Sequence, residues 1–195
     1  ERVERKQHIT KEFDNKEEFE LNWVEASAHP IGAVGLWNSM IKIIKMAKEK
    51  GDDIIVICED DHYFTENYSP KLLFKEVTEA YIQGAEVLSG GIGGFGQAIP
   101  AGYHRYKVDW FWCTQFIVIY NRFFDKMLDF SLQNTDTADG VISKLATNIM
   151  VIYPFISEQK DFGYSDVTQS NMEQQGKIRE HFARANKHMK SISLK

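Results

Sequence analysis

The stretch Ile54–Cys58 reads IIVIC and runs directly into Glu59-Asp60-Asp61. An unbroken apolar run without alternation is typical of a strand that is buried on both faces, which is usual in parallel sheets. The three carboxylates then lie at the carboxyl end of this strand, where open α/β sheets bind their ligands. This stretch therefore predicts both the class of fold and the position of a site.

Helical and strand patterns alternate on both sides of this stretch. Apolar residues at helical spacing predict a helix over 33–47 that ends at Gly51. Ser69 followed by Pro70 predicts the start of a second helix, which stops at Gly84. The alternation predicts an α/β fold, a three-layer α/β/α sandwich with a mainly parallel central sheet. We expect the remaining strands at 19–26, 85–88, 111–120 and 149–156, and the remaining helices at 2–13, 121–130, 136–147 and from Met172 onward.

The size and composition fit one folded domain. The chain has 195 residues, of which 43% are hydrophobic and 26% charged, and these values exclude disorder and low-complexity sequence. A formal net charge of −5 argues against nucleic acid as a partner. We expect a single domain over residues 1–170 and a basic helical tail over 171–195. The sequence opens at Glu1 without a leader, so we expect either processing or a missing segment before it.

The basic tail and the two cysteines indicate where in the cell the protein is located. From Lys177 to Lys195 there are six Lys or Arg residues and one acid, so this tail predicts either contact with an anionic membrane surface or an ordinary solvated helix face. Cys58 and Cys113 lie inside apolar runs and lack the spacing of a disulfide framework or a zinc site. We therefore expect reduced thiols in a cytoplasmic protein, with peripheral contact at the inner face of the membrane if the tail binds lipid.

The acidic run is the strongest candidate site. Adjacent carboxylates repel one another, and a divalent cation such as Mg²⁺ or Mn²⁺ relieves that repulsion. In extended geometry Glu59 and Asp61 point the same way, and Asp60 points the other way, toward a ribose or the backbone. The alternative is an acidic surface turn. His62 is of interest because it adjoins the acids.

Three weaker signals remain open. The run Gly91-x-Gly93-x-x-Gly96 has the spacing of a dinucleotide fingerprint, but Pro100 follows where a helix should run, so we expect a flexible or substrate-shaping loop. Trp110 and Trp112 fit either sugar stacking or a place in the core. Asp139 fits either a catalytic carboxylate or part of a helix cap that starts at Asp136. No Gly-x-Ser-x-Gly elbow supports covalent hydrolase chemistry.

Five segments in order resemble glycosyltransferase family 25, which holds lipopolysaccharide-type and procollagen galactosyltransferases. They are the helix start Gly32-Ala33-Val34-Gly35 with Ser39, the strand into Glu59-Asp60-Asp61, Cys113-Thr114-Gln115-Phe116 leading to Asn121-Arg122, Thr137-Ala138-Asp139, and 153–159 followed by Ser165-Asp166-Val167. The family has a first strand followed by R-x-x-R, which Arg2 and Arg5 match. We therefore expect this sequence to begin just after that strand and to lack it.

The resemblance implies a GT-A, nucleotide-diphospho-sugar transferase fold with a DXD-like motif and Mn²⁺ or Mg²⁺. It implies that Asp61 holds the metal with help from Glu59. It also implies that Asp60, Thr114, Gln115 and Gln159 line the donor or acceptor pocket. Asp139 is the family-matched catalytic base, with Asp166 and Glu158 as reserves.

The resulting hypothesis is an inverting, metal-dependent hexosyltransferase of galactosyltransferase type that acts in lipopolysaccharide biosynthesis. It would move a sugar from a UDP-sugar to a glycan or lipid-linked acceptor. A metal-dependent phosphohydrolase could use the same acids to activate water. A non-catalytic glycan-binding module could keep the fold and stack sugar on Trp110 or Trp112.

Overall fold

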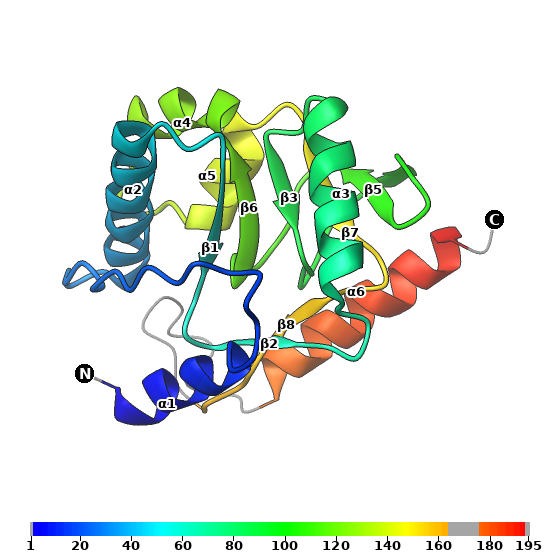
Figure 1. Ribbon diagram of the computed structural model, residues 1–195, viewed down its shortest axis with the longest axis horizontal. Coiled ribbons are helices and arrows are strands. Elements are labelled where there is room, and N and C mark those ends of the chain that lie inside the picture. The colour runs from blue at the N-terminus through cyan, green and yellow to red at the C-terminus, as the bar shows by residue number, and fades with distance from the viewer. Residues whose placement is uncertain (1, 164–175, 194–195) are drawn as a thin grey trace.

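The computed structural model describes residues 2–163 and 176–193 and contains six helices and eight strands within them (Figure 1). The helices are α1 (Val3–Glu12), α2 (Gly32–Lys50), α3 (Pro70–Ile82), α4 (Asn121–Leu128), α5 (Ala138–Leu145) and α6 (Lys177–Ser193). The strands are β1 (Ile54–Cys58), β2 (His62–Phe64), β3 (Val87–Ser89), β4 (Ala98–Pro100), β5 (Arg105–Val108), β6 (Phe116–Tyr120), β7 (Ile149–Ile152) and β8 (Ser157–Gln159).

The central element is a six-stranded sheet in the order β1-β6-β3-β7-β5-β4. Strand β6 is buried along its whole length, and its alternate side chains enter two separate cores. Ile117 and Ile119 join residues of α2, α4, α5 and α6 on one face. Phe116, Val118 and Tyr120 join residues of α1 and α3 on the other. The predicted three-layer α/β sandwich is therefore confirmed.

The expected mainly parallel pairing is wrong. Four of the five pairings between the described strands of this sheet are antiparallel, and β3–β7 is the parallel one. Strand β6 runs antiparallel between β1 and β3, which themselves run in the same direction. Because helices cover both faces of the sheet, its strands are apolar on both sides whatever their direction. Continuous apolarity at 54–58 thus predicted a strand correctly, but it was wrong about the direction of pairing and about full burial of this strand.

Two of the expected strands differ from the structure: one is absent and one is shorter. The segment 19–26 is not a strand, and its apolar residues Leu21 and Trp23 are exposed. The expected strand 111–120 is regular only from Phe116, because Cys113 has a left-handed φ of 77° that interrupts the extended chain. β1 itself is only partly buried: Ile57 is buried, but Ile54 is 37% exposed at the sheet edge.

The helices agree better with the predictions. Helix α2 ends at Gly51 in the left-handed conformation, and α3 is capped by Ser69, whose Oγ accepts from the Leu72 N–H. Thr137, and not Asp136, caps α5 through the Gly140 N–H. Asp136 instead accepts a hydrogen bond from the Gln133 N–H.

Helix α6 carries the basic end of the sequence and packs on the sheet side that holds α2, α4 and α5. Phe182, Ala185 and Met189 are buried in that core. The expected domain boundary at residue 170, like the expected helix start at Met172, lies outside the described residues. Among the described helices, none is both long and apolar enough to cross a bilayer.

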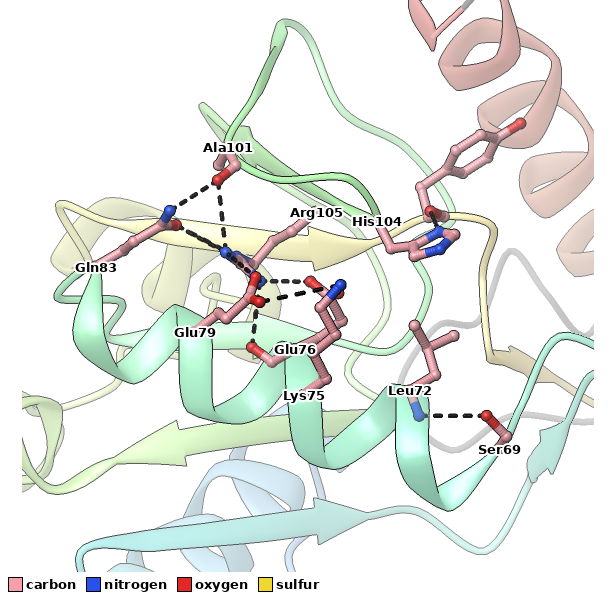
Figure 2. A network of polar contacts seen from close by, with 10 residues as sticks. Ser69, Leu72, Lys75, Glu76, Glu79, Gln83, Ala101, His104 and Arg105 are labelled. Atoms are coloured by element: carbon pink, nitrogen blue, oxygen red, sulfur yellow. Dashed lines mark hydrogen bonds and ion pairs between the residues drawn. The ribbon is translucent and has the colours of Figure 1, made fainter.

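A buried ion pair joins α3 to β5 (Figure 2). The Arg105 guanidinium and the Glu76 carboxylate are both fully buried and hydrogen-bonded to each other. Arg105 also donates to Glu79 Oε2 at 3.3 Å and to Gln83 Oε1 at 3.1 Å, and Gln83 donates to the Ala101 carbonyl at 2.8 Å. This network fixes the outer half of the sheet against α3.

We predict that Arg105→Met lowers the free energy of unfolding by about 3 to 5 kcal/mol, because it leaves the Glu76 carboxylate buried without its cation. Urea unfolding followed by circular dichroism measures the change. Lys75→Met is the matched control, since the Lys75 side chain is 49% exposed and lies 4.0 Å from Glu76, and it should cost less than about 0.5 kcal/mol. Equal effects of the two variants would contradict a dominant role for the buried pair.

Candidate active site

The acidic run forms a turn at the end of β1, beside the start of β6. Cys58 lies opposite Phe116 in the antiparallel ladder, and the next backbone contact is the Glu59 N–H donating to the Gln115 carbonyl at 3.0 Å. The two strands therefore bring 59–61 and 113–115 together, although more than fifty residues separate them in the sequence. These two segments form the centre of the candidate site.

Glu59 is held by Thr114, whose hydroxyl donates to Glu59 Oε1 at 2.6 Å. Burial raises the pKa of Glu59 well above its usual value, and the charge of Asp61 raises it further, whereas the Thr114 hydrogen bond opposes the rise. The Thr114 side chain is itself buried. Glu59 is thus a carboxyl group whose ionised form lacks a compensating charge.

Asp61 is the most enclosed of the three acids, with 5% exposure. Its Oδ2 accepts from Gln159 Nε2 at 2.8 Å and from Arg5 Nη1 at 3.2 Å. Its Oδ1 is buried and has no hydrogen-bond partner among the described residues. Burial raises the pKa of Asp61, while the charge of Arg5 and the Gln159 hydrogen bond lower it.

Asp60 lies on the outer side of the turn, with a half-exposed side chain that pairs with Arg5 at 2.7 Å. Arg5, on α1, is therefore the cation that bridges two adjacent acids, and it is buried. The sequence indicated Arg5 only as part of an R-x-x-R match. Its ion pairs depend on how α1 packs, which no local pattern shows.

These acids suit a divalent cation. A buried carboxylate oxygen without a partner is an available ligand, and Mg²⁺ sites that serve phosphate chemistry use one or two carboxylates and complete the shell with phosphates and water. The described residues hold no cluster of three or more acidic, His or Cys side chains with metal-binding geometry. Asp61 and Glu59 are the residues here that could hold such a cation together with oxygens of a substrate.

Gln115 and His62 belong to a buried network behind the acids. Gln115 Nε2 donates to the Gly91 carbonyl at 2.9 Å and to Ser157 Oγ at 3.2 Å. His62 Nδ1 lies 2.8 Å from the same Ser157 hydroxyl. Gln115 and His62 are 1% and 0% exposed, so they support the site from beneath.

The glycine run is part of that support. A Cβ at Gly91 would lie 1.9 Å from the Ser157 carbonyl oxygen, and one at Gly93 would lie 2.7 Å from Cys113 Sγ. Both glycines are buried. The run therefore serves close backbone packing, and the expectation of a flexible loop is wrong for these two positions.

Asp139 lies within electrostatic reach of Glu59, whose pKa its charge helps to raise. Asp139 Oδ1 accepts from the Thr137 hydroxyl at 2.6 Å and from the Gly140 N–H at 2.8 Å, and Oδ2 accepts from the Cys113 N–H at 3.1 Å. Asp139 thus takes part in the start of α5, beside the Thr137 cap, and its catalytic role stays a prediction.

Cys113 links the candidate site to Asp139, a contact that no sequence pattern indicated. Its left-handed backbone directs its N–H toward Asp139, and its thiol is close to the acids. Burial raises the pKa of this thiol, and the charges of Asp139, Glu59 and Asp61 raise it further. A cysteine with positive φ gives no signal in a sequence, because glycine is the residue expected there.

The reserve carboxylate Glu158 lies on the other face of β8 from Gln159, the residue that contacts the acidic turn. Glu158 accepts a hydrogen bond from the Tyr63 hydroxyl across the β2–β8 pair. Asp166 lies outside the described residues. An open surface depression of about 570 Å³ lies between α1 and the β2–β8 pair, and Tyr63, His8 and Lys160 contribute to its lining.

Comparisons with known proteins identify no family. No family model matches the sequence, and no curated protein matches it. Solved structures with a similar backbone include an apo UDP-glucose pyrophosphorylase, with a TM-score of 0.45 and 10% identity over 79% of this chain and 61% of that one. A UDP-glucose pyrophosphorylase complexed with UDP-glucose has a TM-score of 0.48 and 10% identity over 94% of this chain and 73% of that one. At these values the likeness adds nothing to the α/β sandwich described above.

We predict that His62 makes the protein less stable as the pH falls below 6.5. Burial lowers the pKa of His62 from 6.5 to about 3, so the unfolded chain takes up a proton in this range and the folded chain does not. His62→Asn keeps an acceptor for Ser157 but cannot titrate. The free energy of unfolding, measured in urea at pH 7, 6, 5 and 4, should fall more steeply for the wild type, by up to about 1.4 kcal/mol per pH unit. Parallel pH profiles for the two proteins would contradict this assignment.

Proposed function

We propose that this chain is a metal-dependent glycosyltransferase that resembles family 25 and moves a sugar from a UDP-sugar to a hydroxyl of a glycan or lipid-linked acceptor with inversion. The observation that carries the proposal is the pair Asp61 and Glu59 at the carboxyl end of β1, where one buried oxygen of Asp61 has no hydrogen-bond partner among the described residues. A site of this kind favours a ligand that brings both a cation and phosphate oxygens.

Asp61 and Glu59 are the residues that would hold Mn²⁺ or Mg²⁺. When bound, such a cation stabilises negative charge on the diphosphate leaving group. Gln159 and Arg5 orient the Asp61 carboxylate, and the Thr114 hydroxyl orients Glu59. The chain's contribution here is to fix the direction of both carboxylates before the donor arrives.

The outer side of the turn suits the rest of the donor. Asp60 is the half-exposed acid, and we assign it to the ribose hydroxyls. We also assign Thr114 and Gln159 to the donor pocket, because Thr114 bonds to Glu59 and Gln159 bonds to Asp61. Gln115 contributes indirectly, through its hydrogen bonds to Gly91 and Ser157.

Asp139 is our choice of general base. In an inverting transfer, one carboxylate takes the proton of the acceptor hydroxyl as that oxygen attacks the anomeric carbon from the side opposite the leaving group. Thr137, Gly140 and Cys113 hold the Asp139 carboxylate in a single orientation close to Glu59. Glu158 and Asp166 remain the reserve candidates for this role. We also propose a cytoplasmic location.

We predict that UDP binds in a metal-dependent manner and that Asp61→Asn weakens this binding by at least about tenfold, since it disturbs a metal's ligand shell. Isothermal titration calorimetry with UDP, with and without Mn²⁺, measures both effects. Asp129→Asn, which neutralises an exposed acid at the end of α4, is the control and should bind as the wild type does. If the wild type fails to bind UDP in the presence of Mn²⁺, the transferase proposal is wrong. Phosphate release from a substrate without any sugar acceptor would favour the phosphohydrolase.

We predict that Asp139→Asn lowers kcat for transfer by at least about 100-fold, the usual contribution of a general base, while UDP affinity changes by less than about twofold. Transfer assays and calorimetry on the same preparation measure the two quantities. Asp136→Asn is the control, because this neighbouring acid bonds only to the local Gln133 turn and should retain activity. Loss of folding in Asp139→Asn with unchanged specific activity of the folded fraction would mean that Asp139 is only a cap. Wild-type UDP and sugar binding without turnover would favour the binding module.

A further inference from the structure

An exposed aromatic surface lies beside the candidate active site. Trp112 is 47% exposed, although an indole is among the side chains that gain most from burial. The Trp110 ring lies 5.2 Å from it at 47°, and the His181 ring of α6 meets it edge-on at 5.5 Å. Trp112 is therefore held between two rings and remains half open to solvent.

This surface is tied to the acidic turn by backbone contacts. Trp112 pairs with Gly94 in a short β-bridge, with the Gly93 N–H donating to the Trp112 carbonyl at 2.9 Å. The next residue is Cys113, which donates to Asp139. A Cβ at Gly93 would meet both Cys113 Sγ at 2.7 Å and His181 Cβ at 3.5 Å, so α6 lies directly against this part of the site.

Two cations lie near His181, the ring that meets the exposed indole edge-on. Lys177 and Arg184 lie four residues before and three residues after His181 on α6, which places all three side chains on one face of the helix. The charges of Arg184 and Lys177 both lower the pKa of His181, after burial, which agrees with that placement. Acids lie nearby as well. Glu180 is 3.9 Å from Arg184, and Asp109 accepts from the N–H groups of Gly96, Gln97 and Trp110. Asp161 accepts from the Gly176 N–H beside Lys177 at 2.7 Å, and Asp139 accepts from the Cys113 N–H beside Trp112.

We infer that Trp112, His181, Lys177 and Arg184 form a subsite for an acidic sugar residue of the acceptor, one that carries a carboxylate or a phosphate. The indole face stacks on the pyranose ring, and the two cations pair with the anionic group. The identification of the bound sugar as an acceptor rests on the proposed function. The binding of an acidic sugar at Trp112 can be tested without it.

The positive charge of α6 favours an acidic sugar over a neutral one. The whole chain carries −5, yet α6 has five Lys or Arg residues and one Glu. A basic helix face alone would suit an anionic lipid surface equally well. An indole also suits a membrane interface, but Trp112 lies one residue before Cys113, whose N–H bonds to Asp139 of the candidate site, and this position favours a sugar.

The test is calorimetry with trigalacturonic acid and mannose 6-phosphate, each compared with a neutral partner, galactotriose and mannose. We expect the wild type to bind at least one acidic probe more tightly than its neutral partner. Trp112→Ala should weaken that binding by about tenfold. Trp23→Ala, which removes another exposed indole in the segment 19–26, should leave it unchanged.

A pair of double variants tests the charge. Lys177→Gln with Arg184→Gln should weaken binding of the acidic probe by about fivefold and remove the preference over the neutral one. Arg179→Gln with Lys190→Gln removes the same charge from the opposite side of α6 and should preserve the preference. Equal losses in the two double variants, or binding only to vesicles that contain phosphatidylserine, would overturn the subsite and favour general attraction to anionic surfaces.

Calorimetry with UDP and Mn²⁺ on the same proteins separates the two proposals. Binding of the acidic sugar that depends on Trp112, without any UDP binding, would support the subsite and contradict the transferase. UDP binding with no preference for an acidic probe would overturn the subsite alone.

Discussion

The antiparallel pairing of β1 with β6 is the constraint on which the candidate site depends. Because Cys58 lies opposite Phe116, the residues that leave β1 meet the residues that enter β6. The carboxyl end of one strand thereby receives hydroxyl and amide groups from the amino end of its neighbour, as in the contact of Thr114 with Glu59. A parallel neighbour would have placed the amino end of its strand at the far edge of the sheet, and the acids would have lacked these partners.

The second physical feature is unbalanced negative charge in an enclosed place. Asp61 is buried near Glu59, and Arg5 contacts Asp60 and one oxygen of Asp61. Burial of carboxylates costs free energy unless each is paired, so the turn is less stable alone than with a further cation. Such stored electrostatic cost is typical of functional sites and is hard to explain as packing.

Sequence patterns could predict what depends on local chemistry. The apolar run at 54–58, the helix that ends at Gly51 and the Ser69 cap follow from residue types in short windows, and all three are confirmed. The direction of the strands could not be predicted, because burial on both faces looks the same in either direction. Nor could the network around Arg5, Cys113 and Gln159, since it arises from packing between segments that no spacing rule connects. The predicted roles of the site residues stay predictions.

The partners of Asp61 come from α1 and β8, on either side of it in the sequence, and this has a consequence for the integrity of the candidate site. Arg5 is 56 residues before Asp61 and Gln159 is 98 residues after it. Neither partner belongs to the six-stranded sheet, since Arg5 lies on α1 and Gln159 on β8, which pairs with β2. The orientation of the Asp61 carboxylate therefore depends on two elements outside the sheet whose strand carries the acids. A change that loosens α1 or the β2–β8 pair alters this carboxylate without breaking a strand pairing of the central sheet.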